Sequence, residues 1–439
     1  MRRPKSMGLF FRVGVVAGTV LLLTIAGPPA PADDGPERRS SIVISHNSQF
    51  DADHGVRSGK GTASNPYVIS GWDVDRLEIH DTSAHVVIHD NIVRSTMRLN
   101  WIGHGVHVMD NKVGDLRVNQ NVKRTGAPTS GHFAHNTFGF VGQIRHFDGV
   151  FEHNVVKPGA QFFDWDVIPF VRQGPAVNFD GFNGARFQNN TIYGALRAQL
   201  HGHHHSSGFG EHSHHHSGSS GDVDHSKRYH EVWITNNVIY SDGPYALSYT
   251  DQVHAANDRT AASETEPDLN ESHVHHTRVH LSRNKLIGAG LFVDVFNAND
   301  SRHTATSRGL VEILRNRITI TPVSSTDLFD YKFAGVEVSQ ARDIKLRVVG
   351  NEITAKTSGD GLPDPDLFYG VSPAGIKLWR IELGALYLYD NLVARHDYGI
   401  QASQFKDVVW YIDDLRTRNV NQDVSYDNSS NPPEDRPEP

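Results

Sequence analysis

The stretch Ile234-Thr235-Asn236-Asn237-Val238-Ile239 contains a pattern that occurs ten times along the chain. In each copy an apolar residue stands three positions before an asparagine, and another stands two positions after it. The ten asparagines are Asn91, Asn111, Asn136, Asn154, Asn190, Asn237, Asn284, Asn316, Asn351 and Asn391. All twenty flanking positions are apolar, whereas apolar residues make up only 38% of the chain, so chance does not explain the repeat. A repeat of this kind decides the fold and is interpreted first.

The apolar flanks recur at a period of two residues, which is the period of a β-strand. Asparagine tolerates the left-handed backbone that a tight turn needs, and asparagines stacked in register can form hydrogen bonds along a ladder. The repeat therefore predicts an all-β, single-stranded, right-handed parallel β-helix with an asparagine ladder, in which coils stack at roughly 4.8 Å. A β-sandwich with asparagine-rich turns is the alternative, but it does not require the turn residue to stay in one column.

Composition narrows the function classes. The formal net charge is −8, which argues against a nucleic-acid-binding protein, because such a protein usually carries a basic stripe. The chain has no cysteine, so it has neither disulfides nor thiolate metal sites. A chain of 439 residues would usually contain two or three domains, but the core of a solenoid grows linearly, so one repetitive domain can account for most of this length. We expect this domain to be a monomer.

Both ends of the chain differ from the repeat region. Residues 1–32 start with basic residues, continue with the apolar run Val13–Ala26 and end on small residues, which is typical of an export signal peptide. We expect a secreted, periplasmic or cell-surface protein; retention of this segment as a membrane anchor is the alternative. Residues 33–40 are interpreted as a polar linker before a β-helix over 41–420. The acidic, proline-rich tail 421–439 is expected to be disordered.

The stretch GTASNPYVISGWDV, from Gly61 to Val74, is expected to form the first strand and to close one end of the solenoid. With the asparagine coils that follow, it resembles the NosD-type right-handed β-helix proteins, which belong to the pectate-lyase-like group of carbohydrate-binding proteins and sugar hydrolases. The resemblance extends over roughly Ile42 to Asn419 and implies a pectin-lyase-like solenoid. The functions that it implies range from polysaccharide lyases and epimerases to surface proteins and a periplasmic protein that serves copper-enzyme maturation.

Three long insertions are predicted on consecutive coils. A strand precedes each asparagine strand, and in three coils an insertion follows it, at 201–229, 252–272 and 297–308. We expect these insertions to project side by side from one corner. The first is rich in histidine, glycine and serine, and neutral imidazole is a common ligand of copper, zinc and nickel. The candidate metal ligands are His203, His204, His205, His212, His214, His215 and His216. The alternative is a polar low-complexity loop that binds metal only adventitiously.

The outer face of the preceding strands is the second candidate site. If the apolar residues point inward, polar and aromatic side chains line one outer surface, and these suit a sugar polymer. Tryptophan offers a flat face to a pyranose ring, and a cation can pair with a uronate carboxylate. The candidate substrate-binding residues are Asp180, Arg197, Asp294, Glu337, Lys377 and Trp379.

Three function classes remain open. The first is an exported β-helix that binds or presents a polysaccharide or a cell-surface glycan and carries a metal-binding loop. The second is a lyase, epimerase or hydrolase that acts on an acidic polysaccharide. The third is a periplasmic copper-handling protein of the NosD kind. The sequence does not identify catalytic residues, so it leaves open whether the protein is an enzyme.

Overall fold

The computed structural model describes residues 35–102, 105–119, 131–147, 149–157, 176–181, 184–201, 229–241, 243, 245–252, 276–295, 309–321, 334–356 and 374–426. The chain divides into two compact units, Met1–Gly35 and Pro36–Pro439, and the fold below is that of the second. The predicted signal peptide and the central parts of the three predicted insertions lie outside the described residues. Within the described residues, no helix is long and apolar enough to cross a membrane.

The described elements are 29 strands and two short 3-10 helices. The N-terminal half comprises β1 (Glu37–Ile44), η1 (Asn47–Gln49), η2 (Ala52–His54), β2 (Tyr67–Ser70), β3 (Trp72–Thr82), β4 (Val86–His89), β5 (Ile92–Ile102), β6 (Val106–Met109), β7 (Lys112–Asn119), β8 (Gly131–Ala134), β9 (Thr137–Phe147), β10 (Val150–Glu152), β11 (Val155–Val156), β12 (Val177–Gly181), β13 (Ala185–Gln188), β14 (Thr191–Tyr193) and β15 (Leu196–His201). The C-terminal half comprises β16 (Tyr229–Thr235), β17 (Val238–Tyr240), β18 (Tyr245–Gln252), β19 (His276–Ser282), β20 (Lys285–Gly288), β21 (Gly290–Asp294), β22 (Gly309–Leu314), β23 (Arg317–Ile320), β24 (Ala334–Val349), β25 (Glu352–Ala355), β26 (Ala374–Tyr389), β27 (Leu392–Ser403), β28 (Lys406–Asp413) and β29 (Arg416–Tyr426).

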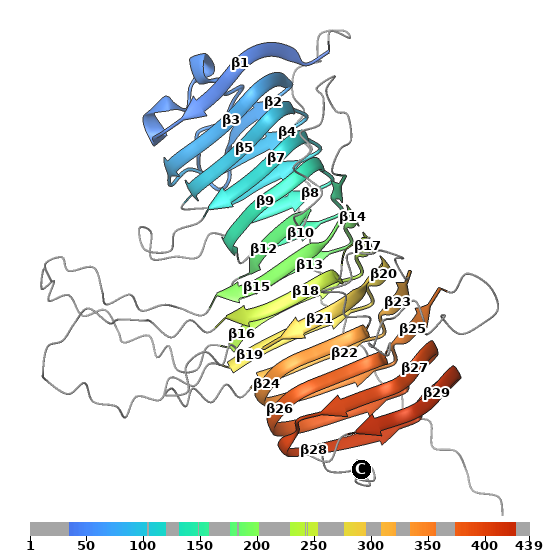
Figure 1. Cartoon of the computed structure of the whole chain (residues 1–439). Coiled ribbons are helices and arrows are strands. Elements are labelled where there is room, and N and C mark those ends of the chain that lie inside the picture. Colours follow the sequence, from blue (N-terminus) through green and yellow to red (C-terminus); the bar gives the residue numbers. More distant parts are fainter. Residues whose placement is uncertain are drawn as a thin grey trace, which may run out of the picture. The chain divides into compact units, whose positions relative to one another are not determined.

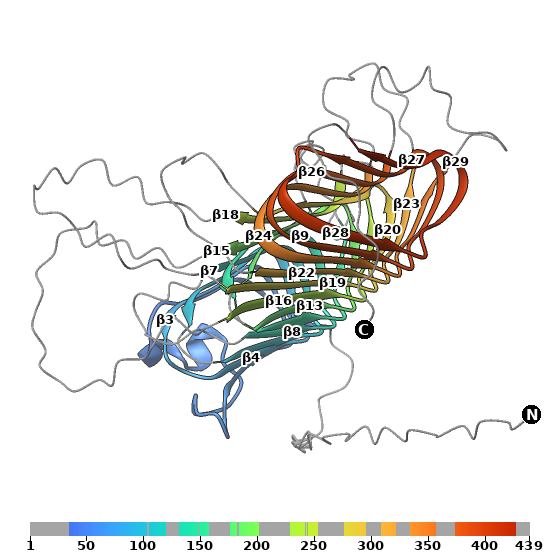
Figure 2. The same cartoon turned by 90° about the horizontal axis from the view of Figure 1, so that it is seen from below.

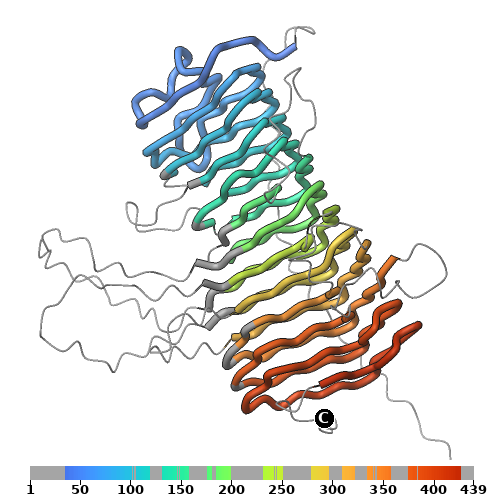
Figure 3. The backbone as a smooth tube through the Cα atoms, in the orientation of Figure 1, coloured from blue at the N-terminus to red at the C-terminus, as the bar shows by residue number. Residues whose placement is uncertain are grey.

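The strands form a parallel β-helix, which confirms the predicted fold class. Every pair of named strands is parallel, as the arrows in Figure 1 indicate, and joins one coil to the next, as the tube in Figure 3 shows. Each coil has three walls. Wall A contains β12, β15, β18 and β21; wall B contains β13, β16, β19 and β22; wall C contains β14, β17, β20 and β23. Some longer strands continue around a corner: β24 pairs with β21 in wall A and with β22 in wall B.

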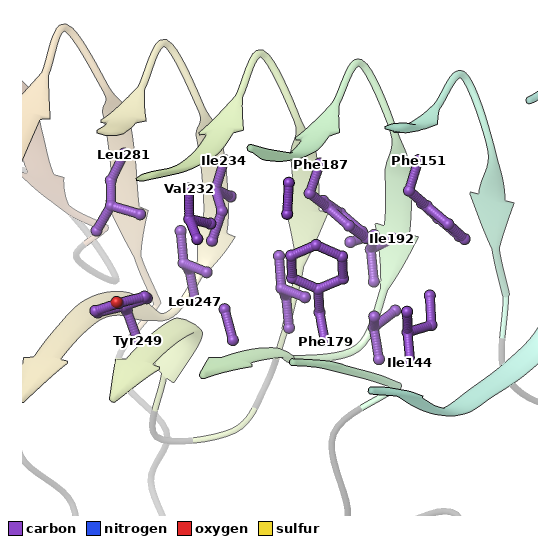
Figure 4. Packing of buried hydrophobic residues seen from close by; sticks show 14 of the residues in the cluster. Ile144, Phe151, Phe179, Phe187, Ile192, Val232, Ile234, Leu247, Tyr249 and Leu281 are labelled. Atoms are coloured by element: carbon purple, nitrogen blue, oxygen red, sulfur yellow. The ribbon is translucent and has the colours of Figure 1, made fainter. Parts of the chain in front are cut away.

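Figure 2 shows the space that the coils enclose, and the core lies there, where inward side chains from the three walls meet (Figure 4). Parallel strands have alternating side chains, so the apolar half of each strand faces this interior. Phe151 and Phe187, which precede successive asparagines, stack with ring centroids 4.9 Å apart. Phe179 from wall A packs edge-on against Phe187 at 5.2 Å. The same inward position on successive coils thus builds one continuous apolar column.

The asparagine ladder is confirmed at the corner between walls B and C. The backbone N–H and the side-chain Nδ2 of Asn237 both donate to Oδ1 of Asn284, each at 3.0 Å. Nδ2 of Asn237 also donates to the carbonyl of Phe187 on the preceding coil, at 3.0 Å. The same bonds link the other coils, so these buried amides satisfy backbone groups that the corner leaves without a strand partner. At the N-terminal end, the N–H of Trp72 donates to Oδ1 of Asn91.

The left-handed conformation predicted for the ladder asparagines is wrong. The residue immediately before the asparagine adopts it, as Asn236 and Arg283 do with φ of 57°. That residue points outward, so several residue types occur there, including aspartate, histidine and arginine. The asparagine recurs on each coil of the ladder because its side chain must reach the next coil. Its own backbone conformation is not the reason.

The β-helix extends beyond its predicted bounds. β1 begins at Glu37, inside the segment predicted to be a linker, and pairs with β3 over its length. β29 runs to Tyr426, inside the predicted tail. Both segments are polar, yet parallel pairing depends on backbone groups that polar residues also possess. The first strand is therefore β1, and not the stretch Gly61–Val74.

The roots of the three insertions lie side by side. The strands that precede the insertions, β15, β18 and β21, pair with one another in wall A. The strands that follow them, β16, β19 and β22, pair in wall B. The chain between these strands spans 202–228, 253–275 and 295–308, so the three insertions start and end at the same corner, between walls A and B, on consecutive coils.

Candidate functional site

Strand register arranges alternate backbone positions of wall A in rows that run along the solenoid. One row, named row 1, joins Arg197, Ser248, Phe292, Glu337, Lys377 and Gln401 on successive coils. The neighbouring row, named row 2, joins Asp180, Gln199, Thr250, Asp294, Ser339, Trp379 and Ser403. Neighbouring positions in a row are about 4.8 Å apart, the usual spacing of paired strands.

All six predicted substrate-binding residues lie in these two rows. Row 1 contains Arg197, Glu337 and Lys377, and row 2 contains Asp180, Asp294 and Trp379. Glu337 and Lys377 are direct neighbours, and Trp379 lies two residues beyond Lys377 on β26. Arg197 lies three coils before Glu337 and is exposed. The backbone of Asp180 belongs to β12, whereas its side chain is outside the described part.

Glu337 is not exposed to solvent, which corrects the expectation that its side chain faces water. Its position is on the outer side of wall A, yet only 1% of its surface is accessible. Its Oε2 accepts a hydrogen bond of 2.9 Å from the hydroxyl of Tyr245. Its Oε1 lies 3.7 Å from Nζ of Lys377. A buried carboxylate requires such partners, because an isolated buried charge is very unfavourable.

Tyr245 is a site residue that the sequence pattern does not identify. Two residues of wall A, Ala246 and Leu247, are both buried between it and the next outward position. The pairing of β18 with β21 shifts register between Tyr245 and Leu247, so the strand contains a bulge. The bulge turns Tyr245 outward, whereas strict alternation from Leu247 and Tyr249 predicts that it points inward. Its ring then packs on Phe292, with ring centroids 4.8 Å apart, and reaches Glu337 two coils away.

The Tyr245 hydroxyl acts as a hydrogen-bond donor. Burial raises the pKa of Tyr245, and the negative charge and hydrogen bond of Glu337 raise it further. The phenol is therefore protonated at neutral pH, and its proton is directed to the carboxylate. This fixes the orientation of the Glu337 carboxylate, which leaves Lys377 beside Oε1.

The two remaining predicted residues on β26 offer complementary contacts. The side chain of Lys377 is 28% exposed, so its ammonium group is accessible while it remains beside Glu337. Trp379 is half-buried on the same strand, between Ser339 and Ser403 in row 2. The ammonium group of Lys377 and the indole of Trp379, two residues apart on β26, can bind carboxylate or hydroxyl groups beside an apolar ring face, whereas the buried Glu337 carboxylate positions Lys377.

The predicted metal ligands cannot be placed in this site. His203, His204, His205, His212, His214, His215 and His216 lie outside the described residues. Within the ranges that the structure does describe, no group of three or more histidine, aspartate or glutamate side chains could hold a metal ion.

Wall B carries a second polar group, which sequence reasoning missed. His280 lies between two carboxylates on neighbouring coils: Nε2 is 2.9 Å from Glu231 and Nδ1 is 2.8 Å from Glu312. Trp233 stacks on the His280 ring at 5.5 Å, and Arg347 donates to Glu312 at 2.7 Å. Only register could have revealed this group, because His280 is 32 residues from Glu312 and 49 residues from Glu231. These side chains satisfy one another, so the group connects the coils that follow the insertions.

Comparison with known proteins adds no family assignment. The chain matches no protein-family model, no curated protein and no solved structure.

Proposed function

We propose that the protein binds a polysaccharide along rows 1 and 2 of wall A. The supporting observation is the group formed by Glu337, Lys377 and Trp379, in which the carboxylate is oriented by the Tyr245 hydroxyl. Binding rather than catalysis is the first choice because Tyr245 is held as a donor and its raised pKa makes it a poor acid or base near neutral pH.

The arrangement suits a chain of linked sugars that runs across the coils. A pyranose ring has an apolar face, which the Trp379 indole can cover, and hydroxyl groups at its edge, which the partly exposed ammonium group of Lys377 can bind. Each coil contributes one position to row 1 and one to row 2. Successive sugars of a polymer that runs along the rows can therefore contact side chains of successive coils. Arg197 and Lys377 place two cationic side chains in row 1, on different coils along the solenoid. Two cations along one row favour the binding of a polymer that carries carboxylate groups.

The proposal is tested by retention on immobilised polysaccharides, using a panel of acidic and neutral polymers. Trp379→Ala is expected to weaken retention on every polymer that binds, because it removes the ring contact. Lys377→Met is expected to weaken retention of the acidic polymers selectively. Trp233→Ala is the matched control, because it removes a half-buried tryptophan from the outer side of wall B. Each variant is also melted, to separate loss of binding from loss of folding.

Two results would overturn the proposal. If the parent binds no polymer of the panel, or if Trp379→Ala and Trp233→Ala reduce retention equally, wall A is not the binding surface. If the acidic polymers are cleaved and unsaturated products accumulate, the protein is a lyase and the binding description is incomplete.

We also propose that the histidine-rich insertion binds a divalent transition metal, with copper preferred over zinc by the usual stability order. One support is the large number of histidines in this insertion. The other is that the strands flanking the three insertions are paired on consecutive coils, so these polar segments start and end at one corner. Calorimetry with the metal ion alone tests this and also separates the copper-handling alternative from the carbohydrate-binding one.

A further inference from the structure

The residues that precede the ladder asparagines form a line along the outside of the corner between walls B and C, which we name the ladder ridge. They are Asp90, Asp110, His135, His153, Asn189, Asn236, Arg283, Arg315, Gly350 and Asp390, and all adopt the left-handed conformation. Aspartate, asparagine, histidine and glycine suit this backbone and occupy eight of the ten positions. Arginine, which has no such preference, occupies the other two, and these two lie on adjacent coils.

Each of the two arginines is followed by a second cation two residues later. Lys285 follows Arg283, and Arg317 follows Arg315. All four side chains are exposed, and strand register pairs Lys285 with Arg317. The four cations therefore form two rows of two across neighbouring coils, with about 4.8 Å between the coils. We name this group the basic corner.

The basic corner has an excess of positive charge. Glu352 on the next coil accepts a hydrogen bond of 2.8 Å from Nε of Arg317, whose side chain is still 65% exposed. Among the residues that the structure describes, Arg283, Lys285 and Arg315 form no ion pair with a carboxylate. Like charges that lie directly opposite each other on paired strands are destabilising. Four cations against one carboxylate therefore oppose folding at this corner.

The backbone holds the basic corner in a fixed shape. The N–H of Arg283 donates to the Leu314 carbonyl at 2.9 Å, and the N–H of Arg315 donates to the Val349 carbonyl at 2.8 Å. A ligand would therefore have to order only the side chains, which lowers the entropic cost of binding. Residues that disagree with their backbone and repel one another are expected where function requires them.

The surroundings of the basic corner favour one kind of ligand. The corner is the outer side of a turn, so it does not enclose a small ion. Asp110 and Asp390 lie on the same ridge, on opposite sides of the basic corner. A flat anionic membrane or a rigid duplex that follows the ridge would meet these carboxylates. A flexible chain, in contrast, can cross the ridge along the two basic coils alone.

We propose that the basic corner binds a flexible linear polyanion that crosses the ladder ridge and places its phosphate or carboxylate groups on Arg283, Lys285, Arg315 and Arg317. The guanidinium group matches both kinds of oxyanion through paired N–H donors. Inorganic polyphosphate and an acidic polysaccharide share this chemistry. The basic corner lies across the coil from wall A, so the inference does not depend on the proposed carbohydrate site.

The test titrates the full-length protein with polyphosphate and with polygalacturonate at low salt, because salt screens exposed charges. In the double variant, Arg283→Asn is combined with Arg315→Asn, which introduces the residue that Asn236 provides on the preceding coil. We expect about tenfold weaker binding. We also expect a higher melting temperature, because asparagine suits the left-handed backbone and the repulsion between the two arginines is removed.

The matched control combines Lys60→Asn with Lys112→Asn, because both lysines are exposed, lie outside the basic corner and carry the same total charge. This control should keep the affinity of the parent. Binding of either polymer that is weakened only in the arginine variant supports the proposal, and the preferred polymer identifies the charged group.

Four results would overturn the proposal. The first is that neither polymer binds, and the second is that both double variants weaken binding equally. The third is that vesicles of anionic phospholipid bind the protein while both polymers do not. The fourth is a lower melting temperature of the arginine variant, because the two arginines would then stabilise the corner instead of opposing its folding.

Discussion

Two corners of the coils differ in how much their structure varies from one coil to the next. The corner between walls B and C turns in the same way on the ten coils of the ladder, with one left-handed residue followed by one asparagine. The corner between walls A and B accommodates insertions that separate β15 from β16 and β18 from β19. The first corner is constant because its backbone groups bond to buried amides of the neighbouring coil. The second tolerates long segments because its strands are already paired before and after each insertion.

This difference implies that stability is concentrated at the ladder corner and that the insertion corner is free to vary. The following substitutions test this contrast, from the largest expected effect to the smallest.

Ile313→Asp should have the largest effect. Ile313 leads into the ladder corner and is completely buried, so aspartate there would place an unpaired charge in the core. We expect a loss of more than about 5 kcal/mol in the free energy of unfolding, or no folded protein. Leu310→Asp is the control on the same strand, near the insertion corner, where Leu310 is half-exposed. Chemical denaturation of both variants measures the difference. Similar unfolding midpoints for Ile313→Asp and Leu310→Asp would contradict the assigned orientation of β22.

Asn237→Ala should have the second largest effect, a loss of about 4 kcal/mol in the free energy of unfolding. The substitution removes the acceptor of the Asn190 N–H and Nδ2 groups and leaves the Phe187 carbonyl without its donor. Each buried group left without a partner costs about 1–3 kcal/mol.

Asn236→Ala is its matched control, because Asn236 is the adjacent residue, is exposed and has φ of 57°. It should cost only about 1 kcal/mol, the usual penalty for alanine in the left-handed conformation. Equal losses in both variants, measured by denaturant unfolding, would show that the ladder amides add nothing beyond the turn.

His396 makes the stability dependent on pH at the third corner, between walls C and A. It is completely buried, Nδ1 bonds to the Ala394 carbonyl, and Nε2 has no partner among the described residues. Burial lowers its pKa from 6.5 to about 4, while the Ala394 carbonyl opposes the shift. As the pH falls, His396 takes up a proton in the unfolded chain near pH 6.5 but in the folded protein only near pH 4. The free energy of unfolding is therefore highest above about pH 6.5 and decreases as the pH falls to about 4.

The His396 contribution should reach about 3 kcal/mol at pH 4, from 1.36 kcal/mol per pKa unit. His396→Leu should remove this part of the acid sensitivity, so its unfolding free energy should change less than that of the parent between pH 7 and pH 4. Replacement of His89, whose side chain is 34% exposed, is the control, and this variant should retain the parent's pH dependence. Parallel pH profiles for parent and His396→Leu would refute the assignment.

Shortening the insertion at 202–228 to a glycine-serine link should have the smallest effect on stability. The flanking strands β15 and β16 keep their partners β18 and β19, so the free energy of unfolding should change by less than about 1 kcal/mol. Copper binding, measured by calorimetry, should be lost, and in the parent it should strengthen as pH rises through the histidine range. A shortened protein that binds copper equally well would place the metal site elsewhere.

The sequence predicted the fold because one pattern encodes it. The apolar flanks of residues such as Asn237 and Asn284 define inward positions, and the structure places these two asparagines on adjacent coils. The sequence also predicted that the six candidate residues lie on one outer surface, and strand register places their backbone positions in two neighbouring rows of wall A. The burial of Glu337 and the outward turn of Tyr245 could not be predicted, because one depends on packing across coils and the other on a bulge. Contacts between residues 92 positions apart, as between Tyr245 and Glu337, follow from register and not from local sequence.

The ladder makes each coil an interchangeable module. Asn136 and Asn154 are 18 residues apart, and Asn190 and Asn237 are 47 residues apart, yet the same amide bonds connect both pairs of coils. A gene segment that starts and ends at equivalent ladder positions can therefore be duplicated or deleted without mismatching the coils on either side. The solenoid can change its length by whole coils during evolution, and each added coil extends wall A by one more pair of outward positions.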